Sequence, residues 1–405
     1  MCAAVAEDRR WAKQYPWLGE EPIPTDSCIS EEIYQQEIEK VFKKVWLSVG
    51  RVEELPEPGC YKLKRLDFAS TSVLLIRGKD NEIRAFHNTC SHRGNTVVVP
   101  EGEWDNFGQK SAFSCRFHAW TYNDQGELIG AQDEKGMPPC FNKSENGLTP
   151  ISLDIWEGFI FINLDENPKV GLKDYLGKMG DHFSGFPYDE ITHCFSYYTY
   201  MDTNWKVGLD AFAEAYHVNT IHAGSFPGTF STGLQMIKLY DDHRSTAVCF
   251  NPPKSAPPVA GLAQSKARGS LVNNVAETIL PPTLNDEKRD DYAFELSVFF
   301  PNWLLHVSEG IWFTHQFWPI AQGKTLWEGK YYVKEPRTNS EKWALEHAMV
   351  VQRNAWLEDT ATMEGTYYAL KSGSKKFMQL HDEEILVRHG YHVLEKYLKG
   401  EEGGH

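Results

Sequence analysis

The sequence lacks the features that would place the chain in a membrane or on a nucleic acid. It contains no apolar run near the roughly 20 residues that cross a bilayer. Its first residues have neither the basic segment nor the apolar stretch of a secretory signal. Its net charge of −15 is opposite in sign to the basic stripe that binds a phosphate backbone. We therefore expect a soluble, cytoplasmic protein without a nucleic-acid or membrane partner.

Cysteine is also scarce, with 8 residues in a chain of 405. That number is too small for a disulfide scaffold, so we expect most of these thiols to be small buried side chains. The sequence has no internal repeat and no low-complexity tract. What it does contain is a globular composition, with 41% hydrophobic, 24% charged and 13% aromatic residues. The length predicts two or three domains, and the aromatic content is typical of a large core or an apolar pocket.

Hydrophobic periodicity changes along the chain and predicts its organisation. Ser30 can cap a helix that continues towards residue 48. Short β-rich runs separated by turns then extend to about residue 165 and predict a small all-β domain. The remainder is mixed, with strand-like runs between about 235 and 333 and helices at 207–221, 340–371 and 382–399. Residues 251–291 are rich in proline and polar residues and predict a long loop or lid.

Two closely spaced Cys/His pairs stand out in the all-β region. They are Cys90-Ser-His92 and Cys115-Arg-Phe-His118. Such pairs, one on each of two loops, suit a tetrahedral zinc ion or a Rieske [2Fe–2S] cluster, in which two cysteines hold one iron and two histidines the other. Neutral imidazole in place of thiolate raises the reduction potential of such a cluster. Two buried cysteines beside unrelated histidines are the less favoured interpretation.

The residues around these pairs resemble the Rieske domain of Rieske-type non-haem iron oxygenases. The family pattern is C-x-H-R-G followed by C-x-x-H-G-W-x-Y, and this chain has Cys90-Ser-His-Arg-Gly94 and Cys115-Arg-Phe-His-Ala-Trp-Thr-Tyr122. The sequence departs from the pattern at Ala119, where glycine is usual, and in a longer polar spacer between the pairs. We place that spacer in a surface loop. The resemblance implies a [2Fe–2S] cluster held by Cys90, His92, Cys115 and His118.

A second pair of histidines, His217 and His222, lies in the mixed region. Five residues correspond to about 140° of rotation on a regular α-helix, so the two rings meet at one metal only if the turn widens or the helix ends between them. Two imidazoles and a carboxylate form the facial triad of non-haem Fe(II) oxygenases. A pair of histidines on one helix face is the alternative interpretation.

The same oxygenase family supports the metal interpretation. Its catalytic motif contains N-W-K, an acidic residue three before the first histidine, Tyr-His and a second histidine, which match Asn204-Trp-Lys206, Glu214, Tyr216-His217 and His222. The resemblance implies that Glu214, in place of the more usual aspartate, links the two metal centres, and we include Asp210 among the catalytic candidates. The third iron ligand is expected downstream, where Asp286, Asp290, Asp291, Asp359 and Asp382 are available. We favour Asp359, because Glu358-Asp359 followed by Glu364 matches the family pattern.

The resemblance covers nearly the whole chain and implies an α+β fold. We expect an N-terminal helical segment at 1–47 that packs on the catalytic domain, a Rieske domain at 48–165, and a catalytic domain at 166–405. In the catalytic domain an antiparallel sheet should wrap around a long C-terminal helix at 341–371 that carries Asp359, the helix-grip architecture. The resemblance implies a terminal oxygenase that uses O₂ and mononuclear Fe(II). Because no G-x-G-x-x-G opens a helix after a strand, electrons should come from a separate reductase, with or without a ferredoxin.

The substrate is predicted less directly. Aromatic residues on the ligand helix and later strands favour a small apolar, aromatic substrate, and we expect Phe212, Phe300, Trp312 and His315 to line its pocket. Monooxygenation of a quaternary or N-methylated amine, or oxidative demethylation, stays open because of Glu214. The family implies a head-to-tail homotrimer, in which a β subunit can also occur. A Rieske electron-transfer protein without oxygenase activity and a zinc-stabilised binding protein are the alternatives from other classes.

Overall fold

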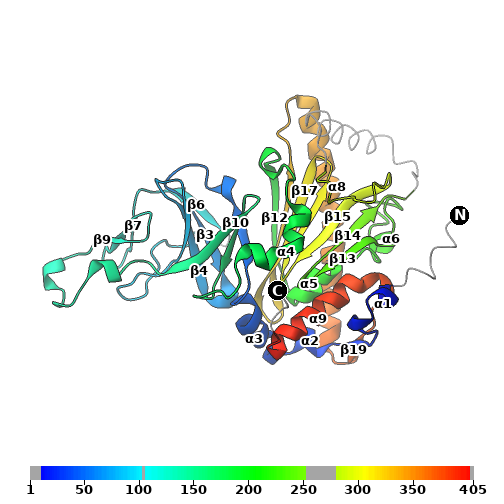
Figure 1. The fold of residues 1–405 in the computed structure, drawn as a ribbon, viewed down its shortest axis with the longest axis horizontal. Coiled ribbons are helices and arrows are strands. Elements are labelled where there is room, and N and C mark those ends of the chain that lie inside the picture. The colour runs from blue at the N-terminus through cyan, green and yellow to red at the C-terminus, as the bar shows by residue number, and fades with distance from the viewer. Residues whose placement is uncertain (1–10, 103–104, 252–279, 402–405) are drawn as a thin grey trace. The chain divides into compact units, whose positions relative to one another are not determined.

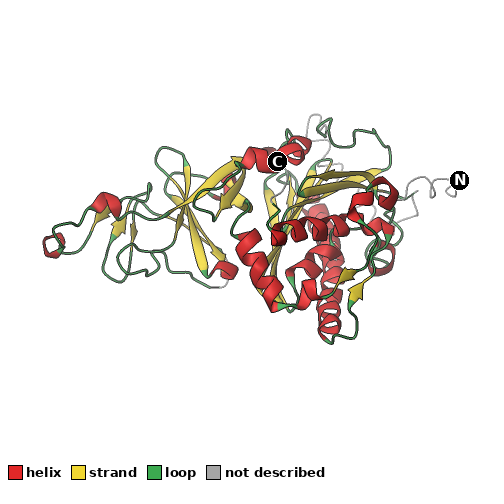
Figure 2. Ribbon diagram, turned by 60° about the horizontal axis from the view of Figure 1, so that its bottom comes forward, coloured by secondary structure: helices red, strands yellow, loops and turns green. Residues whose placement is uncertain are grey.

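The computed structural model describes residues 11–102, 105–251 and 280–401, and it divides into two compact units. The smaller unit extends from Phe42 to Tyr175. The larger unit combines the described residues up to Val41 with those from Leu176 onward. In the smaller unit the regular elements are mainly strands joined by loops and short helical turns, whereas the long helices α8 and α9 belong to the larger unit (Figure 2). This mixture of antiparallel sheets and helices confirms the predicted α+β class.

The smaller unit contains two antiparallel sheets that share one core. The larger sheet has the order β2-β11-β10-β5-β4-β3-β6, with strands Leu47–Arg51, Phe159–Asn163, Pro150–Trp156, Ile83–His87, Thr71–Arg77, Cys60–Leu66 and Asn106–Gln109. The smaller sheet, β7-β8-β9, consists of Phe113–Ser114, Thr121–Tyr122 and Leu128–Gly130. One cluster of buried side chains joins residues of both sheets and includes Cys90 and Cys115. The loops that carry the Cys/His pairs are therefore anchored in a packed core.

The larger unit is organised around a seven-stranded antiparallel sheet (Figure 1). Its order is β12-β18-β17-β16-β15-β14-β13, with strands His193–Met201, Lys324–Val333, Ile311–Ala321, Trp303–Ser308, Tyr292–Phe299, His243–Cys249 and Gln235–Tyr240. The strand-like runs predicted in this region are all present as strands. Their inward and outward alternation decides which side chains reach the helix that crosses the sheet.

That helix is α8, Asn339–Lys371, whose first turn is capped by the Thr338 hydroxyl accepting from the backbone N–H of Glu341 at 3.2 Å. Trp356 on α8 packs edge-on against His315 and Trp327 of the sheet, with ring centroids 4.8 and 5.7 Å away. The sheet thus grips α8, as expected. The remaining helices of more than six residues in the described chain are α3 (Glu31–Glu37), α4 (Leu172–Phe183), α5 (Trp205–Ala211) and α9 (Ile385–Lys399).

The N-terminal segment packs against the rest of the larger unit through buried groups. It contains the short helices α1 (Trp11–Gln14) and α2 (Asp26–Ile29), strand β1 (Ile23–Pro24) and α3, which continues into a π-helical turn at Ile38–Phe42. Strand β1 pairs with β19 (Phe377–Met378) near the other end of the chain. Glu37 of α3 accepts hydrogen bonds from the Trp205 indole at 2.9 Å and the Lys206 ammonium at 2.5 Å.

The helix predicted at 207–221 is not continuous. Helix α5 ends at Ala211, an irregular segment follows, and a single turn, α6, occupies Val218–Ile221. The Glu214 carboxylate accepts the backbone N–H groups of Tyr216 and His217, so these donors do not bond to carbonyls of the preceding turn. An acidic side chain that competes for backbone donors in this way interrupts a helix. The single-helix prediction was therefore wrong at the point where the first histidine is placed.

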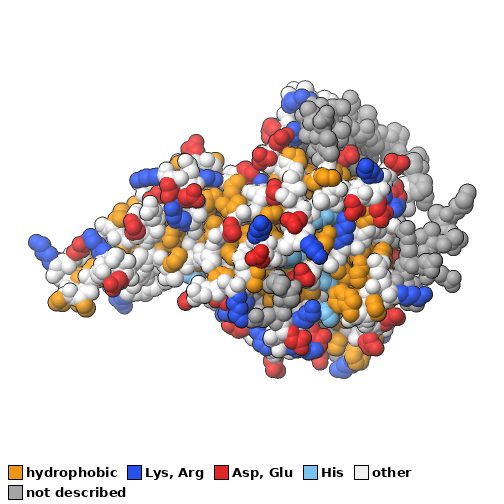
Figure 3. All heavy atoms as spheres, viewed as in Figure 1, with side chains coloured by type: hydrophobic (Ala, Val, Ile, Leu, Met, Phe, Trp, Pro, Cys, Tyr) orange, Lys and Arg blue, Asp and Glu red, His pale blue; other side chains and the backbone are white. Residues whose placement is uncertain are grey.

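Other features concern the outside of the chain. No described helix has the length and hydropathy needed to span a membrane. On the described part of the face drawn in Figure 3, acidic and basic side chains are interspersed. Most of the predicted loop or lid at 251–291, namely residues 252–279, lies outside the described residues.

Candidate metal centres

Three potential metal ligands meet at one point of the larger unit. His217 precedes α6 and His222 follows it, so the two imidazoles flank a single helical turn and their ring centroids lie 5.2 Å apart. Asp359 projects from α8, and its Oδ1 lies 3.4 Å from His217 Nε2 and 3.2 Å from His222 Nε2. One donor atom from each residue lies within 4.8 Å of the other two. Because α6 ends at Ile221, between the two histidines, both rings can reach Asp359.

Each histidine is oriented by a second carboxylate. His217 Nδ1 lies 2.5 Å from Glu214 Oε1, and His222 Nδ1 lies 3.0 Å from Glu358 Oε2. Ser225 donates to the other oxygen of Glu358 at 3.0 Å. An ionised carboxylate can only accept, so both Nδ1 atoms carry protons and donate them. Carboxylates in this position fix the tautomer of metal-binding histidines.

The remaining ring atoms fit a cation. With the proton on Nδ1, a neutral imidazole presents a bare lone pair at Nε2. Both Nε2 atoms face Asp359 Oδ1, which has no hydrogen-bond partner among the described residues. Three acceptor atoms directed at one point repel one another unless a positive ion lies between them. Two imidazoles and one carboxylate are the donor set that non-haem Fe(II) prefers.

The local electrostatics follow from burial and from these carboxylates. Burial raises the pKa of Asp359, which is 3% exposed, although the two histidines oppose that shift. Burial lowers the pKa of His222, but its contacts with Asp359 and Glu358 outweigh burial and raise that pKa. A proton therefore competes with a metal ion for His222 Nε2.

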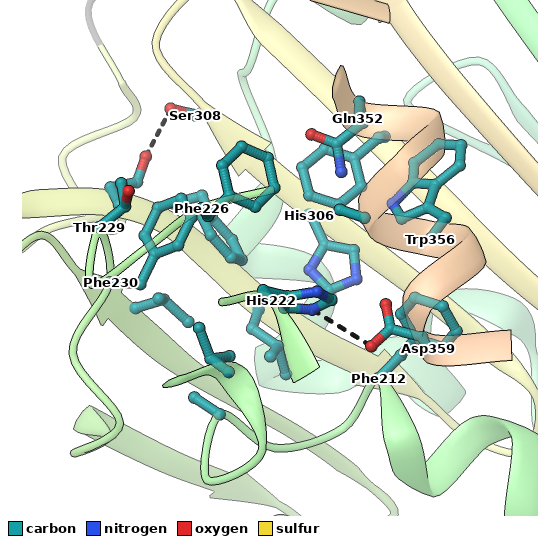
Figure 4. Close-up of a pocket in the computed structure, with 18 of the residues that line it drawn as sticks. Phe212, His222, Phe226, Thr229, Phe230, His306, Ser308, Gln352, Trp356 and Asp359 are labelled. Carbon is teal, nitrogen blue, oxygen red and sulfur yellow. Dashed lines mark hydrogen bonds and ion pairs between the residues drawn. The ribbon is translucent and has the colours of Figure 1, made fainter. Parts of the chain in front are cut away.

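A pocket of about 220 Å³ opens beside this cluster (Figure 4). Its walls are mainly apolar, and Glu214 and Asp359 are the only charged side chains among its described lining residues. The aromatic lining residues are Phe212, Phe226, Phe230, Phe250, Phe294, Phe313, Tyr331 and Trp356. The other polar lining residues are Thr229, His306, Ser308, His315 and Gln352.

Two of the four predicted pocket residues lie in this pocket. Phe212 and His315 line it and stack on each other, with ring centroids 4.1 Å apart. Trp312 does not line it, because strand β17 alternates and places Phe313 and His315 on the pocket face and Trp312 on the opposite face, where it stacks on Tyr332 at 3.5 Å.

Phe300, a predicted pocket residue, and Asp210, a catalytic candidate, lie together in a different buried cluster. Phe300 stacks on Tyr397 and lines a separate small cavity of about 20 Å³ instead of the aromatic pocket. Asp210 lines that same small cavity and accepts a hydrogen bond from Tyr391 at 2.9 Å. Burial raises the pKa of Asp210 to about 7. Neither Glu214 nor His217 is among the described residues that line that cavity.

The sequence analysis missed several residues that line the pocket or support the ligands. Phe294 lies on β15 and His306 on the neighbouring strand β16. The period-2 alternation within each of these strands is the signal that could have found them. Gln352 and Trp356 precede Asp359 on α8 by seven and three positions, a helical spacing that could have found them too.

The smaller unit brings the two Cys/His pairs together. The imidazoles of His92 and His118 lie with centroids 4.6 Å apart, and the His92 ring stacks on Trp120 at 4.9 Å. Both cysteines are 3% exposed, whereas both histidines are half-buried. Buried thiols behind partly exposed imidazoles fit a Rieske cluster, whose two cysteines hold one iron and two histidines the other.

The two ligand loops have the same backbone turn. Gly94 donates its N–H to the carbonyl of Cys90 at 2.9 Å, and Ala119 donates to the carbonyl of Cys115 at 3.0 Å. Gly94 has φ +78° and Ala119 has φ +57°. Both turns therefore need a left-handed residue at the fifth position. The alanine adopts that conformation even though it bears a Cβ.

Hydrogen bonds also surround the cysteine sulfurs. Cys90 Sγ lies 3.2 Å from the Tyr122 hydroxyl, and Asn95 Nδ2 donates to Cys115 Sγ at 3.5 Å. Burial raises the pKa of the Cys115 thiol, but hydrogen bonds from Asn95 and the backbone outweigh burial and lower that pKa. A stabilised thiolate is the form that binds iron.

A two-cysteine, two-histidine site in an all-β unit, together with a two-histidine, one-carboxylate site in a helix-grip unit, defines a Rieske non-haem iron protein. Comparison with known families agrees. Residues 186–400 match the ring hydroxylating alpha subunit (catalytic domain), and residues 45–141 match the Rieske [2Fe-2S] domain. The first match covers more than half of the chain, so the chain belongs to the ring-hydroxylating alpha subunit family. Its cofactors are accordingly a Rieske [2Fe–2S] cluster and a mononuclear iron.

Similar sequences include oxygenase subunits named for carnitine and for glycine betaine. The carnitine monooxygenase oxygenase subunit of Acinetobacter pittii is 29% identical over 213 residues, which are 52% of this chain and 54% of that protein. The glycine betaine monooxygenase oxygenase subunit of Pseudomonas aeruginosa is 32% identical over 227 residues, 56% of this chain and 49% of that protein. The chain thus spans about half the length of the curated relatives it matches.

Solved structures show the same fold over nearly the full length. A quaternary ammonium Rieske monooxygenase in complex with L-carnitine superposes with a TM-score of 0.72 at 21% identity, covering 93% of this chain and 95% of the other. Naphthalene 1,2-dioxygenase from Rhodococcus sp., bound to indole, also gives a TM-score of 0.72 at 21% identity, with 96% of each chain covered. At this level of identity the likeness concerns the fold.

Proposed function

We propose that this chain is the oxygenase component of a Rieske oxygenase system, with His217, His222 and Asp359 as the ligands of the mononuclear iron. The observation that carries the proposal is the meeting of three acceptor atoms, two imidazole Nε2 and Asp359 Oδ1, at the edge of an aromatic pocket. Cys90, His92, Cys115 and His118 are the proposed ligands of the cluster. The motif resemblance and the paired turns of the two loops support this assignment.

The two cofactors supply O₂ activation at an open-sided iron and one-electron delivery from the cluster. The protein contributes position and environment. Glu214 and Glu358 accept hydrogen bonds from the Nδ1–H groups of His217 and His222. These bonds keep the proton on Nδ1 and leave both Nε2 atoms available as ligands. The aromatic walls keep water away from the iron and hold an apolar portion of the substrate beside it.

We also propose that Glu214 links the two centres between subunits of a homotrimer, with a reductase, and in some systems a ferredoxin, as electron donor. The family resemblance supports this role. Glu214 lies directly behind His217 and is 8% exposed, so it connects an iron ligand to the protein around it. Whether a β subunit joins the assembly is a property that a native mass of the purified complex would decide.

The proposed domain division is 48–165 for the Rieske domain and 166–405 for the catalytic domain. The compact units support it, since they divide at Phe42 and Tyr175. The proposal that residues 1–47 pack on the catalytic domain is supported by the buried contact of Glu37 with Trp205 and Lys206.

For the substrate we propose a small methylated amine, which the oxygenase would hydroxylate and demethylate. Aromatic side chains enclose methylated ammonium groups through cation–π attraction. The pocket has eight described aromatic lining residues, and both of its described charged residues are acidic. The named activities of the carnitine and glycine betaine relatives point to the same class.

An apolar aromatic ring is the second candidate. Phe212 and His315 in the pocket wall offer flat surfaces. Trp327, which is not among the described lining residues, stacks on both, inclined by 8° to Phe212. A planar ring can extend such an array by offset stacking. The 2-aminobenzenesulfonate 2,3-dioxygenase subunit alpha of Alcaligenes sp., 33% identical over 189 residues, shows that a relative of similar identity is named for a ring substrate.

The test combines EPR spectroscopy with iron analysis and substrate screening. The reduced protein should show a Rieske EPR signal and about three irons per chain, two in the cluster and one in the triad. His222→Ala should lower the iron content by one without removing the signal. A Rieske signal with only two irons, unchanged after addition of Fe(II), would indicate an electron-transfer protein. Zinc in a colourless protein would contradict the proposal entirely.

The substrate class is tested with a reconstituted reductase. O₂ uptake coupled to formaldehyde release from trimethylammonium compounds would support the amine proposal. Coupled product formation from arenes alone would favour the second candidate.

A further inference from the structure

Two histidines of the pocket have no role in holding the metal. His306 on β16 and His315 on β17 occupy diagonal positions of adjacent strands, since His306 pairs with Phe313 and His315 pairs with Leu304. Diagonal neighbours on one sheet face can touch. Their ring centroids lie 5.4 Å apart at an interplanar angle of 77°, and both line the pocket. Figure 4 shows His306 between His222 and Gln352.

The protonation of His315 follows from its neighbour. The Trp327 indole donates its N–H to His315 Nδ1 at 3.2 Å. Because an indole nitrogen can only donate, Nδ1 must be the acceptor and the proton of the neutral ring is on Nε2. Burial lowers the pKa of His315 well below its ordinary value, which keeps the ring neutral. His315 Nε2–H is therefore a donor, and it has no partner among the described residues.

His306 is likewise buried, neutral and without a hydrogen-bond partner among the described residues. It is 3% exposed and stacks on Phe313 with centroids 4.4 Å apart, and burial lowers its pKa to about 3. Neither of its ring nitrogens has a hydrogen-bond partner among the described residues. A neutral imidazole offers one donor and one acceptor, so the pair holds two unpaired N–H groups in the pocket wall. Their nitrogen atoms have almost no exposed surface, so a ring must turn slightly for a ligand to reach them. Buried donors are rarely left unpaired in proteins unless another group supplies the acceptor.

We propose that His306 and His315 form a polar subsite that accepts an uncharged oxygen of the substrate, a carbonyl, ether or hydroxyl group. This inference rests on the proposed function and specifies the substrate further. We infer an uncharged acceptor because the two imidazoles are neutral and no lysine or arginine is among the described lining residues to pair with an anion at this position. The preferred substrate therefore combines an apolar or methylated portion against the aromatic walls with one neutral oxygen at the two imidazoles.

The experiment measures equilibrium binding to the iron-loaded protein by calorimetry, with probes that differ in one oxygen. The first pair is acetonyltrimethylammonium and propyltrimethylammonium, and the second pair is 1-indanone and indane. We expect the wild-type protein to bind the ketone of at least one pair about tenfold or more tightly than its hydrocarbon analogue, because a site built to donate rejects a ligand that leaves its donors unpaired. Glycine betaine, which replaces the ketone by a carboxylate, should bind more weakly than acetonyltrimethylammonium.

The variant His306→Phe keeps the stack on Phe313 and removes one donor without breaking a hydrogen bond of the described protein. It should reduce the ketone preference to about twofold or less and raise the thermal midpoint of the ligand-free protein. Trp312→Phe is the matched control, because Trp312 lies on the same strand as His315 but faces away from the pocket and stacks on Tyr332. It should leave the preference unchanged.

Several results would overturn the subsite. These are an unchanged preference in His306→Phe, tighter binding of glycine betaine than of the ketone, a lowered midpoint in His306→Phe, or no binding of any of the four paired probes. The proposed amine substrate fails separately. If only the indanone pair binds, with the expected preference, the subsite stands and the amine is replaced by a ring.

Discussion

At the scale of single residues, the metal centres depend on side chains whose only task is to hold another side chain. Glu358 is an example, since it contacts His222 at Nδ1 and is itself held by Ser225. A backbone conformation can have the same importance. Ala119 lies in the left-handed region at φ +57° between Cys115, a proposed cluster ligand, and the tryptophan that packs beside His92.

The turn at Ala119 predicts a gain in stability on substitution. We expect Ala119→Gly to stabilise the smaller unit by roughly 0.5–1 kcal/mol, because relief of the left-handed strain exceeds the added flexibility of the unfolded chain. Gly94→Ala, at the matching position of the other loop, should destabilise by a similar amount. Chemical denaturation followed by the visible absorbance of the cluster measures both. Gly130→Ala is the control, because that glycine has open space around its Cβ position and no left-handed φ.

Glu358 predicts a change in metal affinity. Removing the carboxylate in Glu358→Ala frees the His222 ring to rotate and to change tautomer, so iron affinity should fall by about 10–100-fold. Glu358→Gln, which retains an acceptor, should lose less. Competition with a chelator gives the dissociation constants. Equal affinity in Glu358→Ala and the wild type would show that the contact has no influence on the metal site.

The same site predicts a dependence of iron binding on pH. In the metal-free protein Asp359 and Glu358 raise the pKa of His222 above its ordinary value of 6.5. The proton must leave before Nε2 can bind a metal, so affinity should increase as the pH rises through that raised pKa and fall below it. The chelator titration repeated between about pH 6 and 8.5 measures this slope. A profile that does not change with pH would show that metal binding displaces no proton from His222.

At the scale of elements, strand alternation and a helix interruption place the functional groups. Strand β17 divides its side chains between the pocket and the opposite face of the sheet, and α8 presents Gln352, Trp356 and Asp359 to the pocket. Helix α6 is a single turn that ends at Ile221, directly before His222, and this end allows His217 and His222 to converge. Each of these positions follows from backbone geometry. A shift of one residue along the strand or the helix would turn these side chains away from the pocket.

The alternation of β17 predicts two different phenotypes for neighbouring residues. Trp312→Leu should destabilise the protein by about 3 kcal/mol and leave substrate preference unchanged, because Trp312 is fully buried against Tyr332 outside the pocket. Phe313→Leu should cost only about 1 kcal/mol and change the relative rates on substrates of different size. Thermal unfolding and competition assays separate the two effects. A change of preference in Trp312→Leu would contradict the assigned register.

At the scale of the whole molecule, contacts between distant segments complete the larger unit. The Glu37 carboxylate and the Lys206 ammonium are 169 positions apart in the chain, and both are buried. Glu37 also accepts from Trp205, the residue that begins α5. The N-terminal segment therefore supports α5, the helix that precedes the segment carrying the proposed iron ligands His217 and His222.

This buried pair predicts an asymmetric response to substitution. Glu37→Ala should destabilise the protein by about 3–5 kcal/mol, because it leaves the Lys206 charge buried and unpaired. The double substitution Glu37→Leu and Lys206→Met should cost much less, since it removes both charges. A double-mutant cycle by denaturant unfolding measures the coupling. Equal losses in the single and double variants would show that the pair itself contributes little.

The sequence by itself determined the class of each metal site and the main elements. The Cys/His spacing, the His217 and His222 pair and the Glu358-Asp359 dipeptide are local patterns, and local chemistry specifies them. Hydrophobic periodicity also located four strands of the smaller unit (β3, β4, β5 and β11), six of the seven strands of the larger sheet and the long helix α8, because periods of 2 and 3.6 are properties of short segments. It did not locate β12 or the short strands β7, β8 and β9.

Only the tertiary structure decided which of these residues meet. His222 and Glu358 are 136 positions apart, and their contact depends on how α8 lies in the sheet. The exclusion of Trp312 from the pocket, the place of Asp210 in a separate cavity and the unpaired nitrogens of His306 and His315 have the same origin. Register, burial and a missing hydrogen-bond partner are set by packing between segments far apart in the chain, and no local pattern encodes them.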